Sequence, residues 1–330
     1  MKILPCRATY AVPVLLLALG CGPEAGVIDP PARADAVEPS LKAERYSPWS
    51  PPVPLDGVNS ASTDQQPALS KDGLSLYFAS NRLGGPGGVD IWVAQRDCVD
   101  GCPWMAPAPL GLTVNGPFAD ISPSLSRDGH QLFFASQRPH DHCDPPSPPQ
   151  CTNRDLWVSY RENVHDDFSW GEAVNLGDFI NSPGEEIAPS YFENDDAGIP
   201  QLFFNIGAVS GDIYVSELQN GVWGGPTPVG ELNTPGTDQR PSISHDGRQI
   251  YFFSDRDGVN RLWVARRQSL SEHWSAPERV DLDFPTGNQE AIMPFIHSHG
   301  RTETLLFVHP FGVLARDLWI TTRTRLRGSD

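Results

Sequence analysis

The segment that decides the fold of this chain is Pro67-Ala-Leu-Ser-Lys-Asp-Gly-Leu-Ser-Leu-Tyr-Phe-Ala-Ser-Asn-Arg82. It recurs without gaps at 123–138 and 241–256, and weaker copies begin at Pro189 and Pro294. An Asp-Gly pair between two runs of apolar and aromatic residues indicates two strands joined by a tight turn. Five copies of such a unit predict a repeat protein built from β-strands.

A third and a fourth strand are expected in each repeat. The third strands are expected to start at Asp90, Asp155, Asp212, Arg261 and Asp317. The fourth strands are expected to start at Trp49, Trp104, Trp170, Trp223 and Trp274. A period of about 50 residues with four short strands is typical of a β-propeller. We therefore predict an all-β propeller of five four-stranded antiparallel blades.

All nine tryptophans of the chain fall at two positions of this repeat, in the third and fourth strands. A four-stranded blade cannot bury both its faces alone, so neighbouring blades must stack. A large flat indole at a fixed place in every blade predicts packing between blades. A carbohydrate-stacking surface is the alternative interpretation.

The order of the repeats predicts how the ring closes. The chain begins its first repeat with a fourth strand near Trp49 and ends with a third strand near Trp319. The N-terminal strand can therefore complete the last blade, which removes an exposed sheet edge. We expect the propeller to span residues 46–323, followed by a short tail at 324–330.

The repeated motif Pro-x-x-Ser-x-Asp-Gly-x-x-Leu-Tyr-Phe-x-Ser-x-Arg, followed by Asp-Ile-Trp-Val, resembles the PD40, or TolB-like WD40-type, propeller repeat. The resemblance is close in the first, second and fourth copies, whereas the third and fifth lack the Asp-Gly turn and the arginine. It implies a periplasmic or surface scaffold for protein partners. TolB itself carries an additional α/β domain and six blades, for which this chain has no room.

The N-terminus has the features of a bacterial lipoprotein signal. A basic start precedes the apolar run Val12–Leu19, which is too short to span a bilayer, and Leu17-Ala-Leu-Gly-Cys21 resembles a lipobox. Residues 1–20 are predicted to be a signal peptide and Cys21 to be acylated, so that a lipid is the only membrane anchor. Residues 21–45 are predicted to be a disordered tether. Because Gly22 is not aspartate, we expect the outer membrane, with the propeller facing the periplasm or the cell surface.

The net charge of −17 argues against nucleic acid as a partner. In an oxidising compartment the four remaining cysteines predict two local disulfides, Cys98–Cys102 and Cys143–Cys151. A zinc site is the alternative, although neither spacing matches that of structural zinc sites.

The connections that lead into the first strand of each blade carry acidic residues, which we expect to ring one mouth of the central channel. These are Asp64, Asp120, Glu185, Glu186, Asp238 and Glu290. Three arginines, Arg82, Arg138 and Arg256, should reach the same face and form ion pairs with some of the acids. The third and fifth copies lack this arginine, so unpaired acids are expected at Glu185, Glu186 and Glu290. Unpaired acids at this mouth would favour Ca²⁺ or a basic peptide.

These observations predict a non-catalytic, monomeric envelope lipoprotein that binds an envelope protein or peptide and uses no cofactor. The sequence contains no phosphate-binding loop and no His-Glu-x-x-His motif. The alternative is a carbohydrate-binding or glycoside-cleaving propeller, in which two of the mouth carboxylates would do the chemistry.

Overall fold

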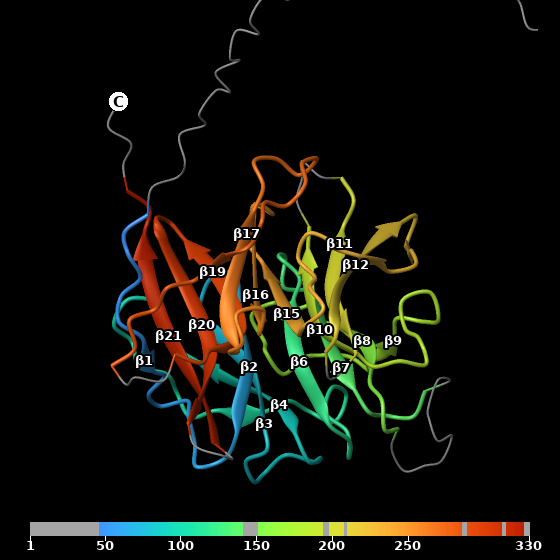
Figure 1. Cartoon of the computed structure of the whole chain (residues 1–330). Coiled ribbons are helices and arrows are strands. Elements are labelled where there is room, and N and C mark those ends of the chain that lie inside the picture. The colour runs from blue at the N-terminus through green and yellow to red at the C-terminus, as the bar shows by residue number, and fades with distance from the viewer. Residues whose placement is uncertain are drawn as a thin grey trace, which may run out of the picture. The chain divides into compact units, whose positions relative to one another are not determined.

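The computed structural model describes residues 46–140, 151–193, 198–207, 210–285, 289–311 and 315–326, and the described residues form strands and loops without an α-helix (Figure 1). Among them, no helix has the length and apolar character needed to cross a membrane. The predicted signal peptide, the lipidation site Cys21, the tether and Cys143 lie outside the described residues.

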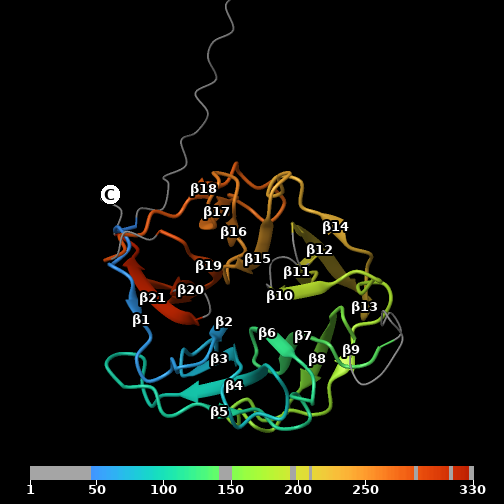
Figure 2. The same ribbon diagram turned by 60° about the horizontal axis from the view of Figure 1, so that its bottom comes forward.

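Five antiparallel sheets surround a central axis (Figure 2). The innermost strands are β2 (Asp64–Leu69), β6 (Asp120–Leu125), β10 (Glu186–Phe192), β15 (Asp238–Ile243) and β19 (Ile292–His299). The second strands are β3 (Ser75–Ser80), β7 (Gln131–Ser136), β11 (Gln201–Ile206), β16 (Gln249–Ser254) and β20 (Thr302–Phe311). The third strands are β4 (Asp90–Gln95), β8 (Asp155–Tyr160), β12 (Asp212–Gln219), β17 (Arg261–Arg266) and β21 (Ala315–Thr324). The outer strands are β5 (Ala108–Pro109), β9 (Val174–Asn175), β14 (Thr227–Pro228), β18 (Glu278–Arg279) and β1 (Val53–Pro54), and blade 3 also contains β13 (Val222–Trp223). The prediction of a five-bladed propeller is confirmed.

The ring closes between its two ends, as the order of the repeats predicts. Strand β1 pairs antiparallel with β21, so the last blade is made from both ends of the propeller. The Asn59 side chain accepts a hydrogen bond from the Leu318 backbone N–H and donates one to the Leu318 carbonyl oxygen, both at 2.9 Å. The first turn of the propeller is thereby fixed to its last strand.

The tryptophans of the outer region pack between blades. Four of the five lie edge-on against an aromatic ring in the second strand of the preceding blade, with ring centroids 6.3–6.5 Å apart. The pairs are Tyr77–Trp170, Phe133–Trp223, Phe203–Trp274 and Tyr251–Trp49. This edge-to-face geometry is favourable for aromatic pairs. The packing interpretation of these tryptophans is confirmed.

A left-handed residue occurs at the same place in the innermost strand of every blade. These residues are Gln66, Ser122, Ala188, Arg240 and Met293, with φ between 55° and 58°. Each is followed by proline, and the pairing with the second strand shifts register there. A bulge of this kind redirects a side chain, and a non-glycine residue at positive φ costs about 1–3 kcal/mol. Here the bulges place one side chain per blade in the lining of the central channel.

Candidate functional site

At the channel mouth, three of the predicted acids form ion pairs with the predicted arginines. The pairs are Asp64–Arg82 at 2.5 Å, Asp120–Arg138 at 2.7 Å and Asp238–Arg256 at 2.6 Å. All three carboxylates are fully buried. Because each pair is complete within its own blade, these acids do not converge on a shared ligand.

Blade 2 illustrates what each pair does. The Arg138 guanidinium donates to Asp120, to the Ser136 hydroxyl and to the Val114 carbonyl oxygen of the turn before the blade. It also lies over the rings of Phe134 and Trp157. Blades 1 and 4 repeat this arrangement. We call it the Asp–Arg latch, because it ties the entering turn to the second and third strands.

Blade 3 has a glutamate in place of the latch aspartate and lacks the arginine. The Glu186 Oε1 atom accepts a hydrogen bond of 2.5 Å from the Ser182 hydroxyl, and its buried Oε2 atom has no partner among the described residues. Burial, together with the nearby charges of Asp155 and Glu185, raises the pKa of Glu186 to about 7. Glu186 is one of the three acids expected to be unpaired, and it has no cationic partner among the described residues.

Glu185 differs from that prediction. Its carboxylate forms an ion pair with Arg154, which lies in the loop that leads into β8 of the neighbouring blade. The repeat pattern did not predict this pair, because the residue before the predicted start of the third strand is an arginine only in blades 2 and 5, and Arg316 of blade 5 instead donates to the Gln65 side chain. Two carboxyl groups adjacent in sequence thus have opposite environments: Glu185 faces a guanidinium, and Glu186 is desolvated.

Blade 5 departs further from the pattern. The innermost-strand position of the latch acid is occupied by Ala291, and Glu290 precedes it. The Glu290 carbonyl oxygen bonds with the His309 Nδ1 atom at 2.7 Å. The His309 ring stacks on Phe284 and contacts Trp319 edge-on. Aromatic packing therefore replaces the latch in this blade.

Carboxyl groups also meet across the blade boundaries, which the sequence analysis missed. Burial raises the pKa of Asp90 and of Asp317, and the latch acid of the next blade, Asp120 or Asp64 respectively, adds to the increase. For Asp90 burial is the larger cause, and the pKa reaches about 6. The sequence signal was the aspartate at the predicted start of the third strand in blades 1, 2, 3 and 5, but only the closed ring of blades brings it close to the next blade.

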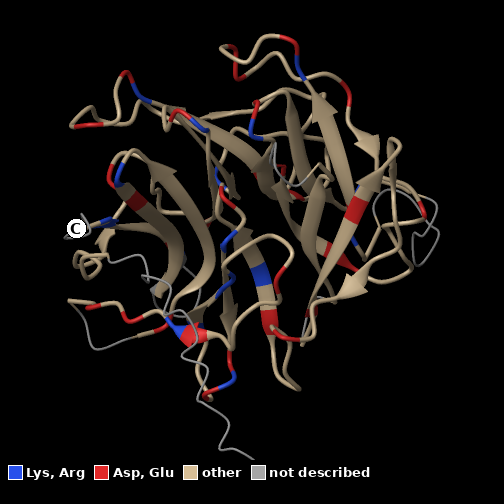
Figure 3. Ribbon diagram, turned by 90° about the horizontal axis from the view of Figure 1, so that it is seen from above, with Lys and Arg blue, Asp and Glu red and all other residues tan. Residues whose placement is uncertain are grey.

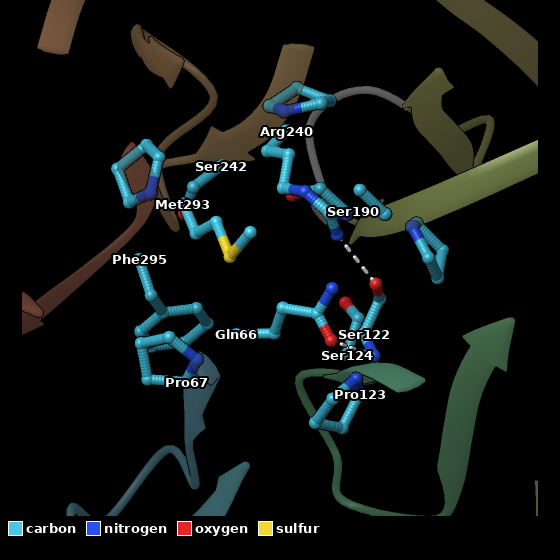
Figure 4. A pocket seen from close by; sticks show the side chains of 14 residues that line it. Gln66, Pro67, Ser122, Pro123, Ser124, Ser190, Arg240, Ser242, Met293 and Phe295 are labelled. Carbon is cyan, nitrogen blue, oxygen red and sulfur yellow. Dashed lines mark hydrogen bonds between the residues drawn. The ribbon is translucent and has the colours of Figure 1, made fainter. Parts of the chain in front are cut away.

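The channel narrows to a cavity of about 40 Å³ that is lined by all five blades (Figure 4). Its polar atoms come from Gln66, Arg240 and the serines of the innermost strands. Arg240 reaches across the channel and donates from Nη1 to the Ser122 hydroxyl at 2.9 Å. The repeat pattern did not predict a role for Arg240, because the five residues at this position carry five different kinds of side chain.

The cysteines and metal-ligating groups can be placed in part. Cys98 and Cys102 form a disulfide with Cα atoms 5.3 Å apart, and Cys151 is also disulfide-bonded. Within the described ranges, no group of three or more His, Cys, Asp or Glu side chains is placed to hold a metal ion. Figure 3 shows that most charged residues lie on connecting loops and strand ends rather than along the strands.

No family model and no curated protein sequence matches this chain. Among solved structures, the catalytic domain of a GH62 α-L-arabinofuranosidase from Coprinopsis cinerea is similar with a TM-score of 0.59 at 11% identity, over 84% of this chain and 97% of that one. An α-L-arabinofuranosidase from Lactobacillus brevis has a TM-score of 0.54 at 13% identity, over 82% and 94%. A protein of unknown function from Dyadobacter fermentans has a TM-score of 0.53 at 10% identity, over 84% and 99%. At these identities the likeness establishes the five-bladed propeller fold.

The comparisons correct the functional expectation. A non-catalytic protein-binding scaffold was the preferred interpretation of the repeat, and an enzyme was not expected. Both expectations are contradicted, because several of the similar solved propellers are glycoside hydrolases. The finding favours the alternative that the sequence left open, a propeller that binds or cleaves glycosides.

Proposed function

We propose that this protein cleaves glycosidic bonds at the channel mouth of blade 3, with Glu186 as the general acid and Glu185 as the second carboxylate. The observation that carries the proposal is the contrast between these neighbours. Glycoside hydrolysis needs one protonated carboxyl group and one carboxylate, and proteins obtain them by giving two acids different environments. Glu186 has a pKa of about 7 because it is buried, while Glu185 lies against Arg154.

In this mechanism the two groups divide the work. Glu186 gives its proton to the leaving glycosidic oxygen as the bond to the anomeric carbon breaks. The Glu185 carboxylate stabilises the positive charge that develops on the sugar. Water then adds to the anomeric carbon, leaves its hydroxyl on the new reducing end and gives its other proton to the Glu186 carboxylate, which restores the general acid. A general acid with a pKa near 7 is largely protonated below that pH and still transfers its proton readily.

The turn over Glu186 must move for this chemistry, because the side chain is fully buried. Residues Ser182 to Glu185 cover it: the Ser182 hydroxyl binds the carboxyl group, and a Cβ built on Gly184 would lie 3.4 Å from Oε1. Substrate that displaces the Ser182 hydroxyl would open the path to the proton. This makes Ser182 a positioning residue.

The test is hydrolysis of 4-nitrophenyl glycosides, including the α-L-arabinofuranoside, and of arabinose- and xylose-containing polysaccharides. We expect the wild-type protein to release sugar and Glu186→Gln to lose at least about 100-fold in kcat, because the amide cannot donate the proton. The matched control is Glu278→Gln, which changes an exposed glutamate on β18 and should leave kcat unchanged. Absence of hydrolysis across the panel by folded wild-type protein, or full activity of Glu186→Gln, would refute the proposal.

We also propose that the protein is exported and held at the outer membrane by acylated Cys21, and that its repeats are of the PD40 type. The lipobox-like Leu17–Cys21 segment and the repeated Pro-x-x-Ser-x-Asp-Gly motif support these two proposals. Labelling with a radioactive fatty acid in a bacterial host should mark the wild-type chain, and Cys21→Ser should abolish the label and release the protein from membranes.

A further inference from the structure

The cavity in the central channel, here called the channel waist, is lined by equivalent strands of all five blades, but among the described residues only one of its side chains is charged. The five left-handed positions that line it carry an amide, a hydroxyl, a methyl, a guanidinium and a thioether in chain order. Arg240 supplies the guanidinium, and it is the only charged residue that lines this cavity within the described part of the chain. A functional role, rather than the repeat, is the natural reason for a cation at this point.

Arg240 lacks a counterion. It makes no salt bridge with any described carboxylate, and its buried Nε atom has no hydrogen-bond partner among the described residues. Burial and the nearby charges of Arg154 and Arg316 lower its pKa to about 9, and Glu185 only partly offsets them. A partly buried cation without a counterion is costly, so an anion in the cavity would relieve the cost.

The serines of the innermost strands add hydrogen-bond donors to this cavity. The Ser124, Ser190 and Ser242 hydroxyl oxygens each accept a hydrogen bond from a backbone N–H of the next blade. Their own hydrogens are not used in any described hydrogen bond, and all three residues line the cavity. A hydroxyl that already accepts can still donate. The site therefore offers O–H and N–H donors around a cation, which is the chemistry that binds anions.

The size of the cavity limits what can enter. A volume of about 40 Å³ has room for about three water molecules. Chloride or a carboxylate of formate size fits this space, whereas a sugar ring does not. The cavity is therefore separate from the glycoside site proposed at the mouth of blade 3.

We propose that the channel waist is a binding site for a small monovalent anion, chloride or a formate-sized carboxylate, held by Arg240 and the serine hydroxyls around it. The occupant neutralises Arg240, the only charged residue among the described residues that line the cavity, and the Arg240 side chain of blade 4 reaches Ser122 of blade 2 across the axis (Figure 4). This inference does not depend on the proposed hydrolase activity.

The test measures thermal unfolding of the full chain at constant ionic strength and pH 7.5, with sodium glucuronate as the background salt. We expect replacement of glucuronate by chloride or by formate to raise Tm in a saturable manner, because ligands of the native state stabilise it. Arg240→Gln should raise, at least tenfold, the anion concentration at which half of the Tm increase is reached. Glutamine is the natural residue at the equivalent position of blade 1, Gln66, so the bulged backbone can accept it. The exposed Arg279→Gln is the matched control and should respond as wild type.

A direct measurement keeps the inference open to refutation if Arg240→Gln fails to fold. Chloride-35 NMR of the wild-type protein should show line broadening that formate abolishes and glucuronate does not. Equal Tm values in chloride, formate and glucuronate, an undiminished chloride response in folded Arg240→Gln, or absent or formate-insensitive broadening would overturn it.

Discussion

At the scale of single residues, identical functional groups acquire different properties from small changes in their surroundings. The latch acids Asp64, Asp120 and Asp238 each have an arginine, and Glu186 occupies the same strand position without one. The carboxyl group that cannot find a cation becomes the one with a raised pKa. A missing arginine in one repeat therefore identifies the candidate acid more specifically than the presence of any motif.

The pH dependence of stability should report this residue. Because the folded pKa of Glu186 is about 7, against about 4.5 when unfolded, its contribution to stability is present below pH 4.5 and is lost as pH rises through about 7. We expect Glu186→Gln to be more stable than wild type at pH 8, by up to on the order of 3 kcal/mol, and equal to it near pH 4.5. Urea unfolding at several pH values measures this. A variant that loses stability equally at every pH would contradict it.

At the scale of the structural element, two features stabilise the blades: the Asp–Arg latch ties the entering turn of blades 1, 2 and 4 to the strands of the same blade, and an outer indole packs on the preceding blade. The latch can be predicted in part from the sequence, since the repeat places an acid at the start of the first strand and an arginine after the second strand. The pairing of Glu185 with Arg154 could not be predicted, because it joins two blades through positions whose residue type varies from one repeat to the next.

The latch should be costly to break from one side. In Arg138→Leu the Asp120 carboxylate stays buried without its cation, and we expect a loss of about 3–5 kcal/mol in the free energy of unfolding. The double variant Arg138→Leu with Asp120→Asn should recover part of that loss, because no buried charge remains. Denaturant melts compare the two, with the exposed Arg279→Leu as the control. A double variant that is less stable than the single one would show that the latch acts mainly through packing.

The packing device has its own test. Trp223 lies edge-on against Phe133 and Tyr191, so Trp223→Ala should leave a cavity between blades 2 and 3 and cost about 3–5 kcal/mol. Thermal denaturation followed by circular dichroism measures the loss. Trp223→Phe keeps part of the contact and should lose less; an alanine variant with unchanged Tm would exclude a packing role.

At the scale of the whole molecule, stability depends on closing the ring. Asn59 links the two ends of the propeller through the backbone N–H and carbonyl groups of Leu318. Asn233 makes the same two hydrogen bonds to Ile213, but between neighbouring segments of the chain rather than between its ends. The two asparagines thus allow the closure to be separated from an ordinary turn.

We expect Asn59→Ala and Asn233→Ala to cost similar amounts at equilibrium, about 1–3 kcal/mol, because each leaves one buried backbone N–H without its acceptor, while the Leu318 and Ile213 carbonyl oxygens keep the Leu55 and Val229 N–H donors. Asn59→Ala should increase the unfolding rate more, since separation of the ends is the natural first step in opening a closed ring. Stopped-flow unfolding in guanidinium compares them. Equal rates would mean that the ring does not open at its closure.

The sequence alone determined the class of fold, the number of blades, the closing strand and the packing role of the tryptophans. Each of these follows from a local period that is repeated five times: turn, strand and indole at fixed spacing. The tertiary structure decided which acids are paired, where Arg154 and Arg240 point, and that carboxyl groups of adjacent blades meet. The physical reason is that these properties depend on residues brought together across blades, at positions where the repeats differ from one another. The candidate chemistry therefore lies where the symmetry breaks, in Glu186 at the mouth and Arg240 at the waist.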